Sequence, residues 1–229
     1  MLMLLIIILW ILLISAFTIF GAYYARKYCK PDALIGLYVS FVLLSNILAV
    51  KIAEFDFGFI SFTATAATLI FSVTFLFTDI VNEKFGRRET QKMIFIAFVS
   101  QIASTLFIWM ALSLPSASFW TGQDKFADIL SFVPRIMLAG WIAFLISENA
   151  DAYIFSWFKK KTNGKYLWMR NAFSSIPSMA LDTVIFVTIA FYGNQPLLPL
   201  IIGVMVLKWL VALVDIPFMY LSRKIMNKK

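Results

Sequence analysis

The chain has 229 residues, of which 62% are hydrophobic and 14% are charged, and its formal net charge is +8. A soluble domain carries about 45–50% apolar and about 25% charged residues, so this composition excludes a single soluble core and points to a lipid bilayer. The bases lie in short clusters between apolar stretches, which is the pattern of membrane orientation and not of nucleic-acid binding.

Seven apolar stretches are long enough for a transmembrane helix, which needs about 20 residues. They are residues 2–25, 33–52, 60–80, 92–113, 132–156, 173–193 and 199–221. The first is interpreted as a retained helix, because no basic residues precede it as they would in a secretory signal peptide. Because no linker or low-complexity tract divides the chain, we expect an all-α integral membrane protein. It would be a single transmembrane domain of about seven helices over residues 1–229.

Basic residues occupy alternate connections between the predicted spans. Arg26, Lys27 and Lys30 follow the first span, Lys84, Arg87, Arg88 and Lys92 the third, Lys159, Lys160, Lys161, Lys165 and Arg170 the fifth, and Arg223, Lys224, Lys228 and Lys229 the last. Among the other connections, residues 114–131 are expected to form an external loop with an interfacial aromatic segment. The positive-inside rule therefore predicts a multi-pass protein of the cell membrane, with its N-terminus outside and its C-terminus in the cytoplasm.

Polar side chains inside the predicted spans are the candidates for a substrate site, because charge inside a bilayer is costly and needs a reason. The candidates are Asn46, Asp79, Arg135, Glu148, Asp151, Asp182 and Lys208, with Asp215 as a further acid in the last span. The five acids outnumber the two bases. At least one acid is therefore expected to be protonated, or to meet a cationic substrate, water or a loop base.

Asp182 and Lys208 lie near the middle of two spans that are neighbours in sequence and therefore antiparallel. They are expected to form an ion pair, to line a substrate cavity, or to do both. Ser175 and Ser178 share a helix face with Asp182, because the spacing matches the helical repeat.

Glu148 and Asp151 are three residues apart in the inner half of the fifth span. One hypothesis is that a carboxyl group there, with Glu148 as the candidate, exchanges a proton during transport. The alternative is that Arg170 or a loop lysine neutralises both acids.

The inner end of the third span places Asp79 and Glu83 on one helix face. Charge is tolerated at such an interface, so Glu83 is interpreted as structural, while a structural and a functional role both stay open for Asp79. Gly86 is expected to cap this helix. Asn46, in the second span, either joins two helices or contacts a ligand.

Four segments carry a family resemblance: Ser45–Lys51 (SNILAVK), Thr78–Gly86 (TDIVNEKFG), Pro134–Ile136 with Asp151 downstream, and Arg170–Ser175 (RNAFSS) followed by Asp182–Thr183. Together they resemble the queuosine precursor transporter family, also described as a vitamin uptake transporter family, over about residues 33–222. The resemblance implies a six-helix core over those residues, with residues 1–26 as an extra N-terminal helix. We expect that first helix to be peripheral and to line no cavity.

The resemblance also implies import of 7-deazaguanine precursors of a modified tRNA base, such as preQ0 or preQ1. Such a base presents N–H groups that a carboxylate accepts, a carbonyl for an amide or ammonium donor, and a flat face for an aromatic wall. Asp182, Glu148, Asn46 and Lys208 supply the polar groups. The expected partners are this small-molecule substrate and the lipid bilayer, with no cofactor and no nucleic acid.

Three other functions are alternatives to direct transport. A substrate-binding subunit of an ATPase-energised uptake system is the main alternative, and its ATPase would be a separate protein, because the chain has no Walker A loop. A membrane-embedded enzyme is disfavoured by the absence of histidine and by the single cysteine, Cys29. A scaffold has no need for ionisable groups near the midplane.

Overall fold

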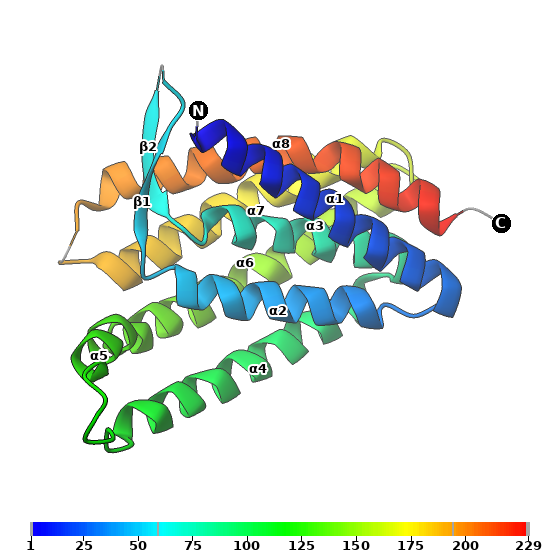
Figure 1. Cartoon of the computed structure of the whole chain (residues 1–229). Helices are drawn as coiled ribbons and strands as arrows, with labels where there is room; N and C mark the ends of the chain where they lie inside the picture. Colours follow the sequence, from blue (N-terminus) through cyan, green and yellow to red (C-terminus); the bar gives the residue numbers. More distant parts are fainter. Residues whose placement is uncertain (1, 59, 194, 228–229) are drawn as a thin grey trace.

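The computed structural model describes residues 2–58, 60–193 and 195–227, and in these ranges the chain is a bundle of seven long helices (Figure 1). The long helices are α1 (Leu2–Tyr28), α2 (Asp32–Leu48), α3 (Thr68–Phe85), α4 (Arg87–Ser113), α6 (Val133–Lys161), α7 (Leu167–Phe191) and α8 (Leu197–Met226). A short helix, α5 (Gln123–Ser131), and a hairpin of β1 (Ile52–Asp56) and β2 (Ser61–Thr65) complete the fold. The predicted all-α membrane fold class is confirmed.

Five helical segments are long and apolar enough to cross a membrane: Met3–Tyr28, Arg87–Ser113, Gln123–Lys161, Leu167–Phe191 and Leu197–Met226. Helix α2 is apolar but has only 17 residues. Helix α3 has 18 residues, of which 12 are buried, and it contacts each of the six other long helices. It can therefore carry Asp79 and Asn82, because protein and not lipid surrounds it.

The hairpin corrects the predicted boundaries of the second and third spans. Residues 52–65 pair as antiparallel strands, from Ile52 opposite Thr65 to Asp56 opposite Ser61, so α2 ends earlier and α3 begins later than predicted. The strand residues alternate in burial and are rich in aromatic and β-branched side chains, which favours strands over helix. The hairpin packs against α8 at Gly203, where a Cβ would collide with the carbonyl oxygen of Thr63.

The segment predicted as an external loop, residues 114–131, is half helical. Its second half forms α5, which has no buried residue. Phe119 is 87% exposed, and Trp120 packs edge-on against Phe126 of α5 with ring centroids 5.9 Å apart. Helix α5 lies at the same end of the bundle as the hairpin (Figure 1).

The basic connections meet at the other end of the bundle, around Glu83. Its carboxylate pairs with Lys159 at 3.3 Å, Arg170 at 2.7 Å and Arg223 at 3.7 Å, which come from α6, α7 and α8. Gly86, with a φ of +85°, ends α3 as expected and lets α4 begin at the next residue. Lys228 and Lys229 of the predicted C-terminal cluster lie outside the described residues.

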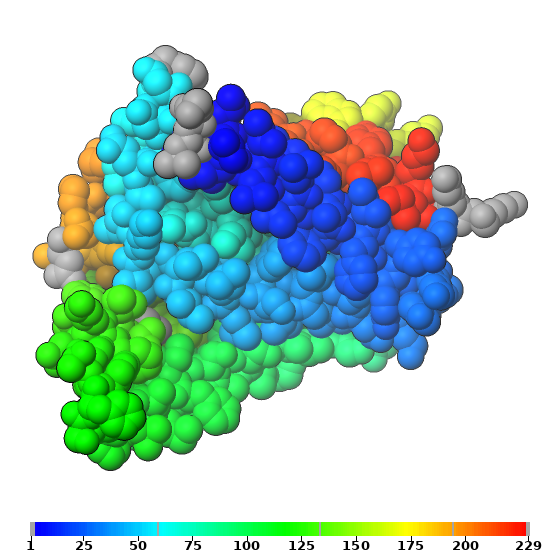
Figure 2. Space-filling model, viewed as in Figure 1, coloured from blue at the N-terminus to red at the C-terminus, as the bar shows by residue number. Residues whose placement is uncertain are grey.

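Helix α1 lies on the surface of the bundle against α8 and α2 (Figure 2). One face is buried through Ile14, Thr18, Ala22 and Ala25, and the indole of Trp10 donates to the carbonyl of Leu69 at 3.2 Å. Only 11% of its apolar window is buried, so the rest of the helix presents a lipid-facing surface. This is the peripheral position that the sequence predicted.

Candidate functional site

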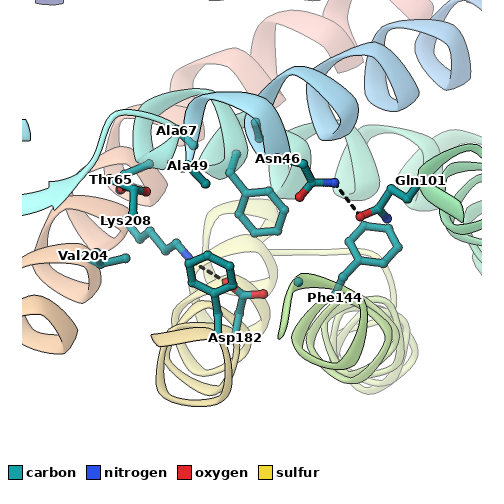
Figure 3. A pocket seen from close by; sticks show the side chains of 14 residues that line it. Asn46, Ala49, Thr65, Ala67, Gln101, Phe144, Asp182, Val204 and Lys208 are labelled. Atoms are coloured by element: carbon teal, nitrogen blue, oxygen red, sulfur yellow. Dashed lines mark hydrogen bonds and ion pairs between the residues drawn. The ribbon is translucent and has the colours of Figure 1, made fainter. Parts of the chain in front are cut away.

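A cavity lies inside the bundle, next to the hairpin (Figure 3). It measures about 470 Å³, its open mouth included. Seven elements contribute side chains to its wall: β2 and helices α2, α3, α4, α6, α7 and α8. The polar lining residues are Ser45, Asn46, Thr65, Thr68, Gln101, Asp182 and Lys208.

The Asp182–Lys208 pair forms one side of this cavity. The Lys208 ammonium donates to Oδ2 of Asp182, and Ser147 of α6 donates to Oδ1 at 3.1 Å. Both charged residues are only 3% exposed. The predicted ion pair is present, and both residues line this cavity; that the cavity holds a substrate stays a prediction. Their proximity follows from the short turn that joins antiparallel helices α7 and α8.

An amide pair lies across the cavity from these charges (Figure 3). Nδ2 of Asn46 donates to Oε1 of Gln101 at 2.7 Å, whereas Nε2 of Gln101 has no protein partner among the described residues. Gly140 packs beside this pair, and a Cβ there would stand 3.4 Å from Oδ1 of Asn46, close to an ordinary van der Waals contact. Gln101 is not among the site residues predicted from the sequence. Its signal was a single amide in the middle of an otherwise apolar span.

Aromatic rings supply the apolar part of the wall. Phe71, Phe144 and Phe186 come from α3, α6 and α7 and line the space around the two polar pairs. The Lys208 ammonium stands 5.0 Å from the centroid of the Phe71 ring, so the ring also stabilises that charge. A flat, polar-edged solute would find aromatic faces and hydrogen-bonding edges in the same cavity.

Glu148 lies outside this cavity in a buried cluster of hydroxyl donors. Its Oε2 accepts hydrogen bonds from Tyr38 at 3.0 Å and Thr78 at 2.8 Å, and Thr74 is 3.4 Å from Oε1. No ion pair involving Glu148 is found in the described part of the chain, and its exposure is 0%. Its environment thus offers hydrogen bonds but no counter-charge.

Asp79 and Asp151 are also buried without a basic partner in the described ranges. Oδ2 of Asp79 accepts hydrogen bonds from Asn171 and from Ser175, the latter at 3.4 Å. Neither carboxyl oxygen of Asp151 has a protein hydrogen-bond donor among the described residues. Arg170 does not neutralise these acids, because its guanidinium pairs with Glu83. The excess of buried acid over base therefore persists in the folded protein.

Arg135 stands apart from the other candidates. It is exposed at the hairpin end, where Nε donates to the carbonyl of Ile189 at 2.9 Å and Nη2 to that of Tyr192 at 2.7 Å. A cation at this position satisfies carbonyls at the C-terminus of α7. Of the seven candidates, the cavity gathers Asn46, Asp182 and Lys208.

A family model described as "Putative vitamin uptake transporter" matches residues 65–222, from the end of β2 through most of α8. The chain belongs to this family. Its members are transporters and not enzymes, which confirms the resemblance noted in the sequence. The matched region contains most of the residues that line the cavity, whereas Ser45, Asn46 and Ala49 lie before it.

Three relatives of known name also match the chain. A protein of Bacillus subtilis is 31% identical over 184 residues, 79% of each chain, and one of Haemophilus influenzae is 30% identical over 139 residues, 58% of this chain and 54% of its own. Both are named "Probable queuosine precursor transporter". An Escherichia coli protein named "Queuosine precursor transporter" is 24% identical over 143 residues, 62% of each chain. No solved structure matches the chain.

Proposed function

We propose that this protein imports a queuosine precursor, a 7-deazaguanine such as preQ0 or preQ1, and binds it in the cavity beside Asp182 and Lys208. The names of the three relatives support the substrate class. The observation that carries the assignment to this cavity is the position of a buried carboxylate, an ammonium and two amides around aromatic rings.

The chemistry of the base matches these groups in kind. The Asp182 carboxylate accepts hydrogen bonds from an N–H and an adjacent amino group, while Lys208 or the free amide of Gln101 donates to the ring carbonyl. Phe71, Phe144 and Phe186 offer apolar surface to the flat faces of the base. The nucleobase must compete with Lys208 for the Asp182 carboxylate, so binding replaces the hydrogen bond from Lys208 with hydrogen bonds from the substrate. A solute without the N–H groups would leave the carboxylate poorly paired and is rejected.

The proposed orientation places the cavity in the outer half of the membrane. The basic connections define the cytoplasmic end by the positive-inside rule, and the cavity lies next to the hairpin at the opposite end. The ion pairs of Glu83 hold α3, α6, α7 and α8 together at the cytoplasmic end. In this state the protein would receive substrate from outside, and release would require those helix ends to separate.

Import proceeds by secondary transport or facilitated diffusion in this proposal. Glu148 is the candidate for proton coupling, because it is buried, has hydroxyl donors and lacks a basic partner among the described residues. Facilitated diffusion followed by metabolic trapping of the base would need no such group. The two routes differ in whether a pH gradient drives accumulation.

Uptake by cells that lack their own precursor transporter tests the proposed function. Labelled 7-cyano- and 7-aminomethyl-7-deazaguanine should accumulate only when this protein is produced, and unlabelled adenine, which lacks the ring carbonyl and the adjacent N–H, should compete less well than either precursor. An equal rate of uptake with and without the protein in the membrane would reject the assignment. Co-purification with ATPase subunits, together with uptake that depends on them, would favour the binding-subunit alternative.

A further inference from the structure

A second hollow lies at the basic end of the bundle and shares no residue with the substrate cavity. It is a groove of about 980 Å³, its open side included, between the start of α4, the last turns of α6 and the turn at Gly164. Among the side chains that line it are two basic and two aromatic ones: Arg87, Lys160, Tyr153 and Trp157. We call these four residues and the space between them the basic groove.

The basic groove has a positive charge that the described protein does not neutralise. Arg87 and Lys160 form no ion pair in the described ranges, whereas the neighbouring Lys159 pairs with Glu83 at 3.3 Å. The Arg87 guanidinium lies 4.9 Å from the centroid of the Tyr153 ring, so the ring holds it at the groove wall. No side chain caps the first turn of α4 at this point, which adds backbone N–H donors and the positive end of the helix dipole.

The aromatic residues of the groove mark the boundary between water and lipid. Tyr153 and Trp157 are 54% and 46% exposed, and Lys161 covers the Trp157 ring at 4.8 Å. Tyrosine and tryptophan with adjacent bases are typical of the headgroup level of a membrane. The groove is therefore placed where lipid headgroups lie.

An apolar track continues from the groove toward the middle of the membrane. Ile146 and Ile142 lie seven and eleven residues before Tyr153, two and three turns along the same face of α6. They are 46% and 39% exposed. A ligand with a phosphate at the groove and an acyl chain along this face would match both features.

We propose that the basic groove binds the phosphate of an anionic phospholipid from the leaflet at the basic end of the bundle. Arg87 can hold two phosphate oxygens with its planar guanidinium, and Lys160 supplies a second, mobile charge. The acyl chains lie along Ile146 and Ile142. Free phosphate shares the headgroup chemistry but not the chains, so the apolar track distinguishes the lipid from the free anion.

The test uses the purified full chain in detergent. Phosphatidylglycerol, phosphatidylcholine or inorganic phosphate is added at equal concentration, and lipid retention by native mass spectrometry and the midpoint of thermal unfolding are measured. Phosphatidylglycerol should be retained and should raise the midpoint. Phosphatidylcholine, whose choline cation offsets the phosphate charge, and inorganic phosphate, which has no acyl chains, should do neither. An equal effect of inorganic phosphate would overturn the lipid assignment.

Matched variants locate the binding. Arg87→Gln/Lys160→Gln should weaken retention of phosphatidylglycerol by about tenfold or more, because each base near an anionic surface contributes to lipid binding. Arg26→Gln/Lys27→Gln removes the same charge from the same end of the bundle and also two cations that lie over tyrosine rings, and it should bind as the parent does. Equal losses in both pairs would show a general charge effect and reject the groove. If the first pair unfolds without lipid, Lys160→Gln alone, at an exposed position, repeats the comparison.

Discussion

Lys208 of α8 donates a hydrogen bond to Asp182 of α7 inside the bundle, and each residue is 3% exposed. Removing one partner of such a buried pair leaves an uncompensated charge and costs about 3–5 kcal/mol. We therefore expect Asp182→Asn and Lys208→Met each to lower the free energy of unfolding by about that amount. The double variant should recover most of the loss, because neither charge then remains buried alone.

Denaturant unfolding in detergent and uptake assays on the same variants check this expectation. All three variants should lose precursor uptake, including the double variant that inserts and folds. Uptake by a stable double variant would remove the pair from the substrate site. A double variant as unstable as the single ones would show that pairing is not what stabilises these residues.

Gln101 provides a test of the amide side of the cavity. Replacing it with alanine removes a donor and leaves Nδ2 of Asn46 without its acceptor, so precursor affinity should fall about tenfold, which corresponds to about 1.4 kcal/mol. Gln91→Ala on the exposed face of the same helix is the matched control. Half-saturation concentrations for uptake measure both effects, and an unchanged value for Gln101→Ala would exclude this side chain from binding.

Glu148→Gln tests proton coupling while keeping the hydrogen-bonding shape of the site. Tyr38 and Thr78 can still donate to the amide oxygen, so the variant should fold and exchange labelled for unlabelled precursor. It should no longer accumulate precursor in response to a pH gradient across proteoliposomes. Glu54→Gln on the exposed hairpin should behave as the parent chain. Gradient-driven accumulation that survives in Glu148→Gln would exclude Glu148 from proton coupling.

Glu83 should matter far more for stability than a surface acid. In Glu83→Gln, the fully buried Arg170 loses its only carboxylate partner among the described residues, and the expected cost is about 3–5 kcal/mol. Glu89→Gln breaks only the exposed pair with Lys92 and should cost about 1 kcal/mol or less. Thermal unfolding of the two variants side by side gives the difference. Equal midpoints would mean that the Glu83 pairs do not hold the basic end together.

Cysteine accessibility checks the proposed orientation. In a Cys29→Ser background, Lys161→Cys should resist a membrane-impermeant thiol reagent added outside intact cells, because the proposed orientation places the basic end in the cytoplasm. Ser116→Cys, in the exposed segment at the hairpin end, should react. The reverse labelling pattern would invert the topology and place the cavity on the cytoplasmic side.

Much of the helical framework could be predicted because helices in a bilayer must be long, apolar and internally hydrogen-bonded. The hairpin was missed because residues 60–65 are apolar enough to extend the third span, so that residues 53–59 were left as a connection. The alternation in each strand is also short. The Asp182–Lys208 contact was accessible because the two helices are consecutive. The Asn46–Gln101 contact was not, because α2 and α4 are distant in sequence, and periodicity shows which residues share a face but not which helix that face meets.

The partners of Arg135 and Glu83 could not be predicted from the sequence either. The sequence placed Arg135 inside a span, whereas the helix starts close enough to the bundle end for its side chain to reach the carbonyls of α7. Glu83 was interpreted as structural from its place at a helix end. That its partners come from three different helices depends on the packing of the whole bundle.

Equilibrium binding of labelled 7-aminomethyl-7-deazaguanine to the purified protein is the sharpest test of the proposed substrate cavity. We predict saturable binding that falls at least about tenfold in Asp182→Asn, since losing even one hydrogen bond to a charged group costs about 1.5–3 kcal/mol. Asp124→Asn, an exposed acid on α5, should bind as the parent does. Absence of saturable binding, or equal affinity in Asp182→Asn, would mean that the precursor does not bind beside Asp182.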